Sequence, residues 1–104
     1  MTKEQFRKLT ENILLLDGAT GSNLMANGMP RGICTETWVI EHKDIFQELQ
    51  RAYIAAGSQV IYAPTFGGNR INLAKHSLTD RIEEINRTLV GYSRELAGDG
   101  VYVA

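Results

Sequence analysis

The sequence predicts an α/β fold in which parallel strands alternate with helices. Two short apolar runs, residues 13–16 and 59–63, each lead into a glycine-rich turn, and a third run begins at Val101. The segments between these runs carry apolar residues at helical spacing. Because this alternation is typical of βαβ units with right-handed crossovers, we expect about three parallel strands.

A short helix is predicted to lead the chain. Thr2 and Gln5 match a capping box, in which two side chains satisfy free backbone N–H groups of the first helical turn. This predicts a leading helix within residues 1–12, with Phe6 and Leu9 on its buried side.

The first strand is expected at residues 13–16, because four aliphatic residues in a row are typical of a strand buried on both faces. A short helix over residues 22–27 should follow and end at Gly28. The stretch through Cys34 and Trp38 shows no clear periodicity.

The second half of the chain shows a clearer pattern. Apolar residues recur every three or four positions from Lys43 until Gly57, which predicts an amphipathic helix. Residues 59–63 should form the second strand, and residues 69–75 another short helix.

The last helix is predicted to begin at a second capping box, formed by Asp80 and Glu83. Apolar residues at helical spacing continue until Gly98, and residues 101–104 begin the third strand. Three strands cannot close a barrel, so we expect the chain to be the front part of a larger domain.

Composition excludes several classes of function. Eleven basic and twelve acidic residues among 104 give a net charge of -1, so nucleic acid is not an expected partner. No apolar run is long enough to span a membrane, and the polar N-terminus is not a signal peptide, which predicts a cytoplasmic protein. A single cysteine, Cys34, supplies neither an internal disulfide nor a multi-thiolate metal site.

The first candidate site is the turn that begins with Asp17 and Gly18. A carboxylate at the end of a strand can hold a cation such as an ammonium group, and the backbone N–H groups after it can bind an anion. An amino acid carries both charges. The alternative is that Asp17 merely caps the following helix. The turn lacks the spacing and the lysine of a phosphate-binding loop.

The second candidate site follows the second strand. Thr65 could donate a hydrogen bond, Phe66 could form the wall of a pocket, and Gly67 and Gly68 allow a ligand to approach the backbone. The alternative is an ordinary turn with Phe66 packed inward. Turns that follow neighbouring parallel strands lie on the same side of a sheet, so we expect this turn to lie beside the Asp17 turn.

Other residues are weaker candidates. We expect His42 and His76 at the surface, Trp38 anchored on the core and Cys34 as an inert thiol. No catalytic residue is assigned within the chain.

Two stretches together carry a family resemblance. ILLLDGATGSNL, followed by IFQELQRAYIAAGSQVIYAPTFGGNRINLAKHSL, resembles the N-terminal part of the homocysteine S-methyltransferase barrel. The resemblance is closest to the homocysteine-binding module of the cobalamin-dependent methionine synthases. It implies that residues 13–104 are the N-terminal part of an incomplete (β/α)8 (TIM) barrel.

The resemblance also implies a reaction and its cofactors. In this family three cysteines from later strands bind zinc, and the metal binds homocysteine as a thiolate that attacks a methyl donor to give methionine. The donor is methylcobalamin, recharged from methyltetrahydrofolate by other modules, or else betaine or S-methylmethionine. Homocysteine, the remainder of the barrel and the other modules are thus the implied partners.

Carried over by position, Asp17 and Gly18 match the motif that helps to hold the amino-acid end of homocysteine, and Thr65 and Phe66 match the motif that lines the same pocket. Relatives often have Thr-Asn where this chain has Ala63 and Pro64.

The zinc-binding cysteines have no counterpart here, so we expect the chain alone to be an inactive fragment of a methyltransferase. The sequence also allows two alternatives. One is a different barrel or doubly wound enzyme that binds a small carboxylate or phosphate, and the other is a truncated α/β binding module.

Overall fold

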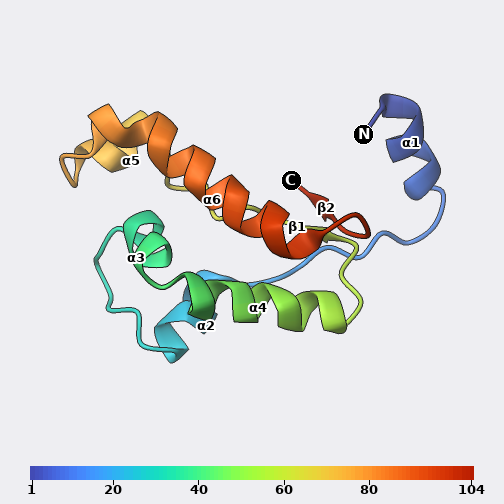
Figure 1. Cartoon of the computed structure of the whole chain (residues 1–104), viewed down its shortest axis with the longest axis horizontal. Coiled ribbons are helices and arrows are strands. Elements are labelled where there is room, and N and C mark those ends of the chain that lie inside the picture. The colour runs from blue at the N-terminus through green and yellow to red at the C-terminus, as the bar shows by residue number, and fades with distance from the viewer.

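The computed structural model describes residues 1–104 and is mostly helical, with two short parallel strands (Figure 1). In chain order the elements are α1 (Lys3–Leu9), α2 (Gly21–Ala26), α3 (Thr35–Glu41), α4 (Lys43–Ala55), β1 (Val60–Ile61), α5 (Arg70–Ala74), the 3-10 helix η1 (Thr79–Arg81), α6 (Ile82–Ala97) and β2 (Tyr102–Val103). The predicted α/β class and the alternation of helices with strands are therefore confirmed, whereas closure into a barrel is not seen in these residues.

The strands pair in parallel, as the sequence predicts. Val60 of β1 lies opposite Tyr102 of β2, and on its other side it forms a parallel bridge with Leu16. The backbone N–H of Asp17 donates to the carbonyl oxygen of Val60 at 3.0 Å, which continues this second pairing. The segment before Asp17, β1 and β2 therefore run side by side in the same direction.

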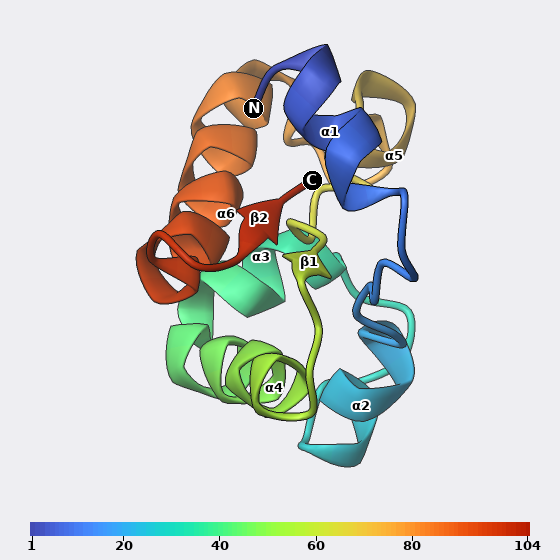
Figure 2. The same cartoon turned by 90° about the vertical axis from the view of Figure 1, so that its right-hand side faces the viewer.

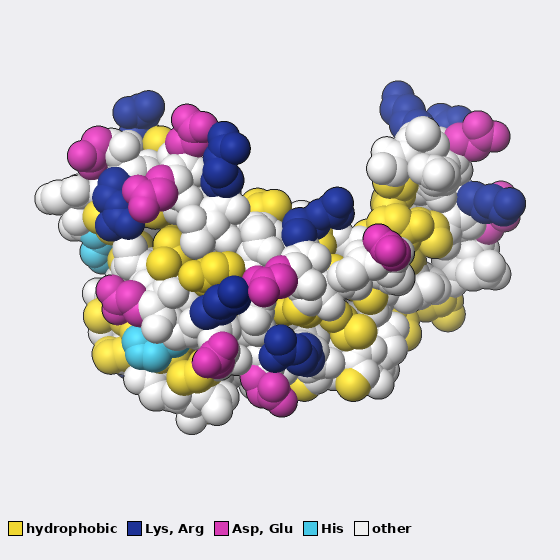
Figure 3. Space-filling view, in the orientation of Figure 1, with side chains coloured by type: hydrophobic (Ala, Val, Ile, Leu, Met, Phe, Trp, Pro, Cys, Tyr) yellow, Lys and Arg dark blue, Asp and Glu magenta, His cyan; other side chains and the backbone are white.

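The first predicted strand is only partly formed. Of residues 13–16, only Leu16 makes a bridge. None of the four is buried on both faces: Leu14 is half-buried and the other three are exposed, with Ile13 at 85%. Hydrophobic side chains gather on this part of the surface, beneath α1 (Figure 3). A parallel strand is buried only where other elements cover both of its faces, and here no helix or strand covers one of them.

Glycines end the two long helices where the sequence predicts. Gly57 follows α4 with a φ of 112° and Gly98 follows α6 with a φ of 59°, in the left-handed region that other residues avoid. Both helices flank the strands on one side (Figure 2). Phe46 of α4 and Leu89 of α6 are completely buried between the helices, which makes this helical layer the main core.

Three local predictions need correction or extension. The capping box of Thr2 and Gln5 forms as predicted, but α1 buries no residue and Phe6 is half exposed, because α1 stands apart from the other helices (Figure 1). The Asp80 capping box does not form, since η1 precedes α6 and no side chain caps α6. The stretch without periodicity contains α3, whose Trp38 is buried in the core.

No helix is both long and apolar enough to cross a lipid bilayer.

Candidate functional site

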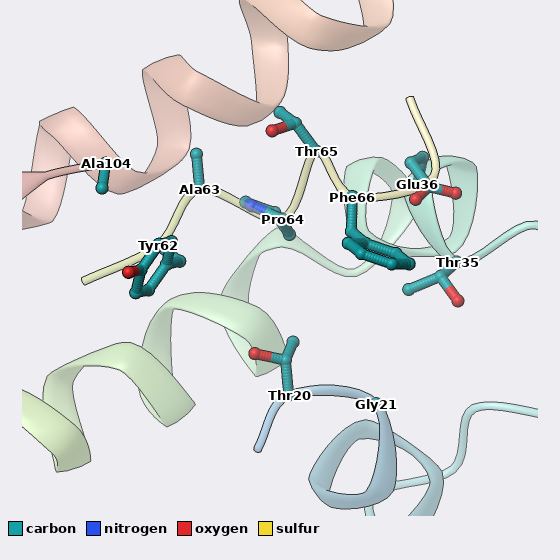
Figure 4. A pocket seen from close by; sticks show the side chains of 10 residues that line it. All are labelled: Thr20, Gly21, Thr35, Glu36, Tyr62, Ala63, Pro64, Thr65, Phe66 and Ala104. Atoms are coloured by element: carbon teal, nitrogen blue, oxygen red, sulfur yellow. The ribbon is translucent and has the colours of Figure 1, made fainter. Parts of the chain in front are cut away.

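A cavity of about 580 Å³ lies where the two glycine-rich turns meet (Figure 4). The chain segments around it come from the turn before α2, the start of α3, the residues after β1 and the C-terminal end of the chain. Its lining residues are Thr20, Gly21, Thr35, Glu36, Tyr62, Ala63, Pro64, Thr65, Phe66 and Ala104. The structure thus brings together two segments that are more than forty residues apart, as their positions after parallel strands predict.

Asp17 joins the two turns directly. Its Oδ2 accepts a hydrogen bond of 3.0 Å from the backbone N–H of Tyr62, a residue that lines the cavity. The residue before α2 is Thr20, not Asp17, and no side chain caps that helix. The alternative that Asp17 caps the following helix is therefore wrong.

Burial changes the acidity of this carboxyl group. Removal from water raises the pKa of Asp17 above its ordinary value of 3.8, and the hydrogen bond from Tyr62 partly opposes that rise. Asp17 itself is not one of the residues that line the cavity. Its charge is nevertheless held one hydrogen bond away from a lining residue.

Gly18 is needed for a close approach of an aromatic ring. A Cβ at this position would lie 3.0 Å from the hydroxyl oxygen of Tyr53. That hydroxyl donates to the carbonyl oxygen of Ala19 at 2.8 Å, and Asn23 donates to the same oxygen at 2.8 Å. Tyr53 of α4 therefore holds the Asp17 turn from behind, and Gly18 leaves space for it.

Thr65 and Phe66 both line the cavity, from the turn that follows β1 (Figure 4). Phe66 is fully exposed, so the alternative in which its ring packs inward is wrong. An aromatic ring with no contact to the core is available to a ligand or to another part of a larger protein. Nearby, Ala63 and Pro64 contribute apolar surface, and Pro64 has no N–H to donate.

Glu36 is a lining residue that the sequence alone did not indicate. It is only 4% exposed, and its Oε1 accepts a hydrogen bond of 2.8 Å from the backbone N–H of Gly67. Its Oε2 lies 3.5 Å from the Sγ of Cys34, which can donate. The sequence shows only an acidic residue two positions before Trp38. Such a local pattern does not reveal a hydrogen-bond partner 31 residues away.

Two asparagines brace the same turn from other helices. Asn72 of α5 donates to the carbonyl oxygen of Gly67 at 2.8 Å, and Asn86 of α6 donates to that of Gly68 at 2.7 Å. A Cβ at Gly68 would lie 2.6 Å from the side-chain oxygen of Asn86. The space beside Gly67 and Gly68 is therefore occupied by neighbouring side chains and is not left open for a ligand, as the sequence had suggested.

The donor set does not fit a zinc site. No group of three His, Cys, Asp or Glu side chains lies close enough together to hold a metal ion. Cys34 is buried. His42 was expected at the surface, but it is half-buried and stacks on Trp38 with ring centroids 3.9 Å apart.

Comparison with known proteins shows which family the sequence matches. The sequence pattern of the family described as homocysteine S-methyltransferase matches residues 14–104. A methionine synthase from Mycobacterium tuberculosis is 28% identical over 97 residues, and one from Mycobacterium leprae is 26% identical over 97 residues. In both cases the match covers 88% of this chain but 8% of the relative, so the chain spans a small part of those proteins. By the match over most of its length, this chain belongs to the homocysteine S-methyltransferase family.

Proposed function

We propose that this chain forms part of the homocysteine-binding site of a methyltransferase of the methionine synthase type, which converts homocysteine to methionine. The observation that carries the proposal is the hydrogen bond between Asp17 and the backbone of Tyr62, which joins the two family motifs at one cavity. Family membership and the similarity to methionine synthases support the choice of homocysteine as the ligand.

This arrangement offers partners for the amino-acid end and for the aliphatic part of homocysteine. The carboxylate of Asp17 would attract the ammonium group of the amino acid, and Gly18, whose missing side chain makes room for Tyr53, would contribute the backbone of the same turn. Thr65 would donate a hydrogen bond from its hydroxyl group, and Phe66 would cover the aliphatic part of the ligand. Asp17, Gly18, Thr65 and Phe66 are thus the proposed substrate-binding residues.

We also propose that residues 13–104 are the first part of a (β/α)8 barrel and that residues 1–12 are a leading helix outside it. A complete barrel of this type typically needs about 250 residues. The exposed side chains of Ile13, Leu15 and Leu16 would then be covered by the remainder of the barrel. The parallel pairing of three consecutive segments is consistent with such a sheet.

The proposed role of this chain is limited to binding. Zinc, which the family resemblance implies, would have to be held by residues outside this chain, because the donor set here does not fit it. Methylcobalamin and methyltetrahydrofolate would likewise be bound by other modules. We therefore expect no methionine formation by the 104-residue chain alone, whatever zinc and methyl donor are supplied.

Calorimetry tests the proposal directly. Homocysteine should bind to the chain with a measurable heat, and Asp17→Ala should weaken binding about tenfold or more, because one charge-assisted contact is lost. Glu11→Ala removes an exposed carboxylate before the first motif and serves as the control. Absence of homocysteine binding, or binding that inorganic phosphate displaces, would contradict the proposal. Methionine formation together with stoichiometric zinc by the isolated chain would contradict the limited role.

A further inference from the structure

We propose that Glu36 is a positioning residue, which holds the backbone of the Thr65–Phe66 turn so that the Phe66 ring forms one wall of the cavity. This inference rests on the proposed function as regards the ligand, but its structural part can be tested without one. Glu36 belongs to α3, a helix outside both motifs that carry the family resemblance.

The contact between Glu36 and Gly67 is close and buried. Glu36 Oε1 accepts the Gly67 N–H at 2.8 Å, and the side chain of Glu36 is almost fully removed from water. A Cβ at Gly67 would collide with Oε1 of Glu36 and would lie 2.6 Å from Nδ2 of Asn72. Only glycine fits at position 67, because a larger residue would displace the carboxylate that contacts its backbone N–H.

No other side chain accepts a hydrogen bond from a backbone N–H of this turn. Asn69, Asn72 and Asn86 donate to the carbonyl oxygens of Phe66, Gly67 and Gly68, whereas Glu36 accepts from an N–H group. Glu36 forms no ion pair with a Lys or Arg side chain, and its two carboxyl oxygens accept from the Gly67 N–H and the Cys34 S–H instead. A hydrogen bond to a buried carboxylate is stronger than one between neutral groups, so its loss affects the turn more.

The position of the Phe66 ring depends on the backbone of the turn, because the ring does not pack against the core. The ring is fully exposed, and in Figure 4 it projects from the turn toward Thr35 at the start of α3. Its direction is therefore set by the backbone of residues 65–67 rather than by packing. Glu36 holds that backbone from the same helix that closes this side of the cavity.

Amide hydrogen exchange in the 104-residue chain tests the structural part. Glu36→Ala should increase the exchange rate of the Gly67 amide about tenfold or more, whereas Glu36→Gln, which keeps an acceptor oxygen, should restore most of the protection. Glu41→Ala, on an exposed position of the same helix, is the matched control and should leave Gly67 unchanged. Unchanged exchange at Gly67 in Glu36→Ala would overturn the proposal.

Binding tests the functional part. Glu36→Ala should weaken homocysteine binding about tenfold, and Glu36→Gln should bind nearly as tightly as the original chain. If the original chain does not bind homocysteine, the proposed function fails while the exchange result still decides the role of Glu36. If the chain binds homocysteine and Glu36→Ala binds it equally well, the positioning role is wrong and the proposed function stands.

A variant on the other side of the contact covers the case in which Glu36→Ala does not fold. Gly67→Ala should displace the carboxylate and speed exchange of the residue 67 amide, because the added Cβ occupies its place. Gly91→Ala is the matched control, since a Cβ at Gly91 meets no neighbouring atom. Exchange at residue 67 that is equally slow in both variants would overturn the proposal.

Discussion

The carboxylate of Asp17 accepts a hydrogen bond of 3.0 Å from the backbone N–H of Tyr62, which lies 45 residues further along the chain. This bond crosses from the end of the first parallel segment to the residue directly after β1. It holds together the two turns that form the cavity, and it places a negative charge beside the proposed position of a ligand ammonium group.

The pH dependence of binding follows from the raised pKa of Asp17. Only the ionised carboxylate attracts an ammonium group, so homocysteine affinity should fall as the pH decreases through this pKa, which burial places above 3.8. Calorimetry from pH 7 downward measures the effect, with the number of protons exchanged on binding as a second readout. Asp17→Asn should bind more weakly and lose this pH dependence; a pH profile shared by both proteins would show that another group is responsible.

The same carboxyl group makes folding stability depend on pH. Since its pKa is higher in the folded chain than in the unfolded chain, the folded state binds more protons between the two values. Its contribution to stability should therefore be most favourable below 3.8, decrease as the pH rises through the folded-state pKa, and stay constant above it. Urea unfolding of the original chain and of Asp17→Asn at several pH values measures this contribution. The free energies of unfolding of the two proteins should differ in their pH dependence only above pH 3.8.

Phe66→Ala should weaken homocysteine binding with little change in the free energy of unfolding. The ring is fully exposed, so the free energy of unfolding should change by no more than about 0.5 kcal/mol, while homocysteine binding weakens. Ile71→Ala, which removes a side chain that is 79% exposed in α5, is the control for both measurements. A large loss of stability in Phe66→Ala, or undiminished binding, would contradict the proposed role of this ring.

Tyr53→Phe should loosen the Asp17 turn without creating a cavity. Loss of the hydrogen bond from its hydroxyl to the carbonyl oxygen of Ala19 should cost about 1 kcal/mol and increase amide exchange in the turn. Tyr102→Phe removes the hydroxyl of a partly exposed tyrosine in β2 and serves as the control. Equal exchange in the turn of both variants would show that Tyr53 does not hold it.

Phe46→Ala should destabilise the chain strongly. Its side chain is completely buried between α4 and the neighbouring helices, and removal of such a ring costs about 3–5 kcal/mol. Thermal unfolding followed by circular dichroism should show a large drop in the midpoint, or no folded state at all. Met25→Ala, at a partly exposed position of α2, should change the midpoint little.

The uncovered strand edge should cause self-association. Ile13 is 85% exposed beside the parallel pairing of Leu16, so the chain at high concentration should form larger species in sedimentation experiments. Ile13→Lys should reduce this association, whereas Ile71→Lys on the far helix α5 should not. A well-folded monomer at all concentrations would argue against the proposal that these residues belong to an incomplete barrel.

The sequence by itself determined the local elements of this protein and the positions of both motifs. Glycines end α4 and α6, the Thr2 box begins α1, and Asp17 and Phe66 each follow a parallel segment. These features depend on backbone geometry and on residues three or four positions apart, which a single sequence displays directly.

Only the tertiary structure decided which long-range contacts form. The sequence could not show that Asp17 binds the backbone of Tyr62 rather than capping α2, or that Glu36 reaches Gly67. It also suggested burial for Ile13, which needs covering elements that these 104 residues do not place there. The physical reason is that burial and contacts between distant residues depend on how whole elements pack, and local patterns carry no information about that packing.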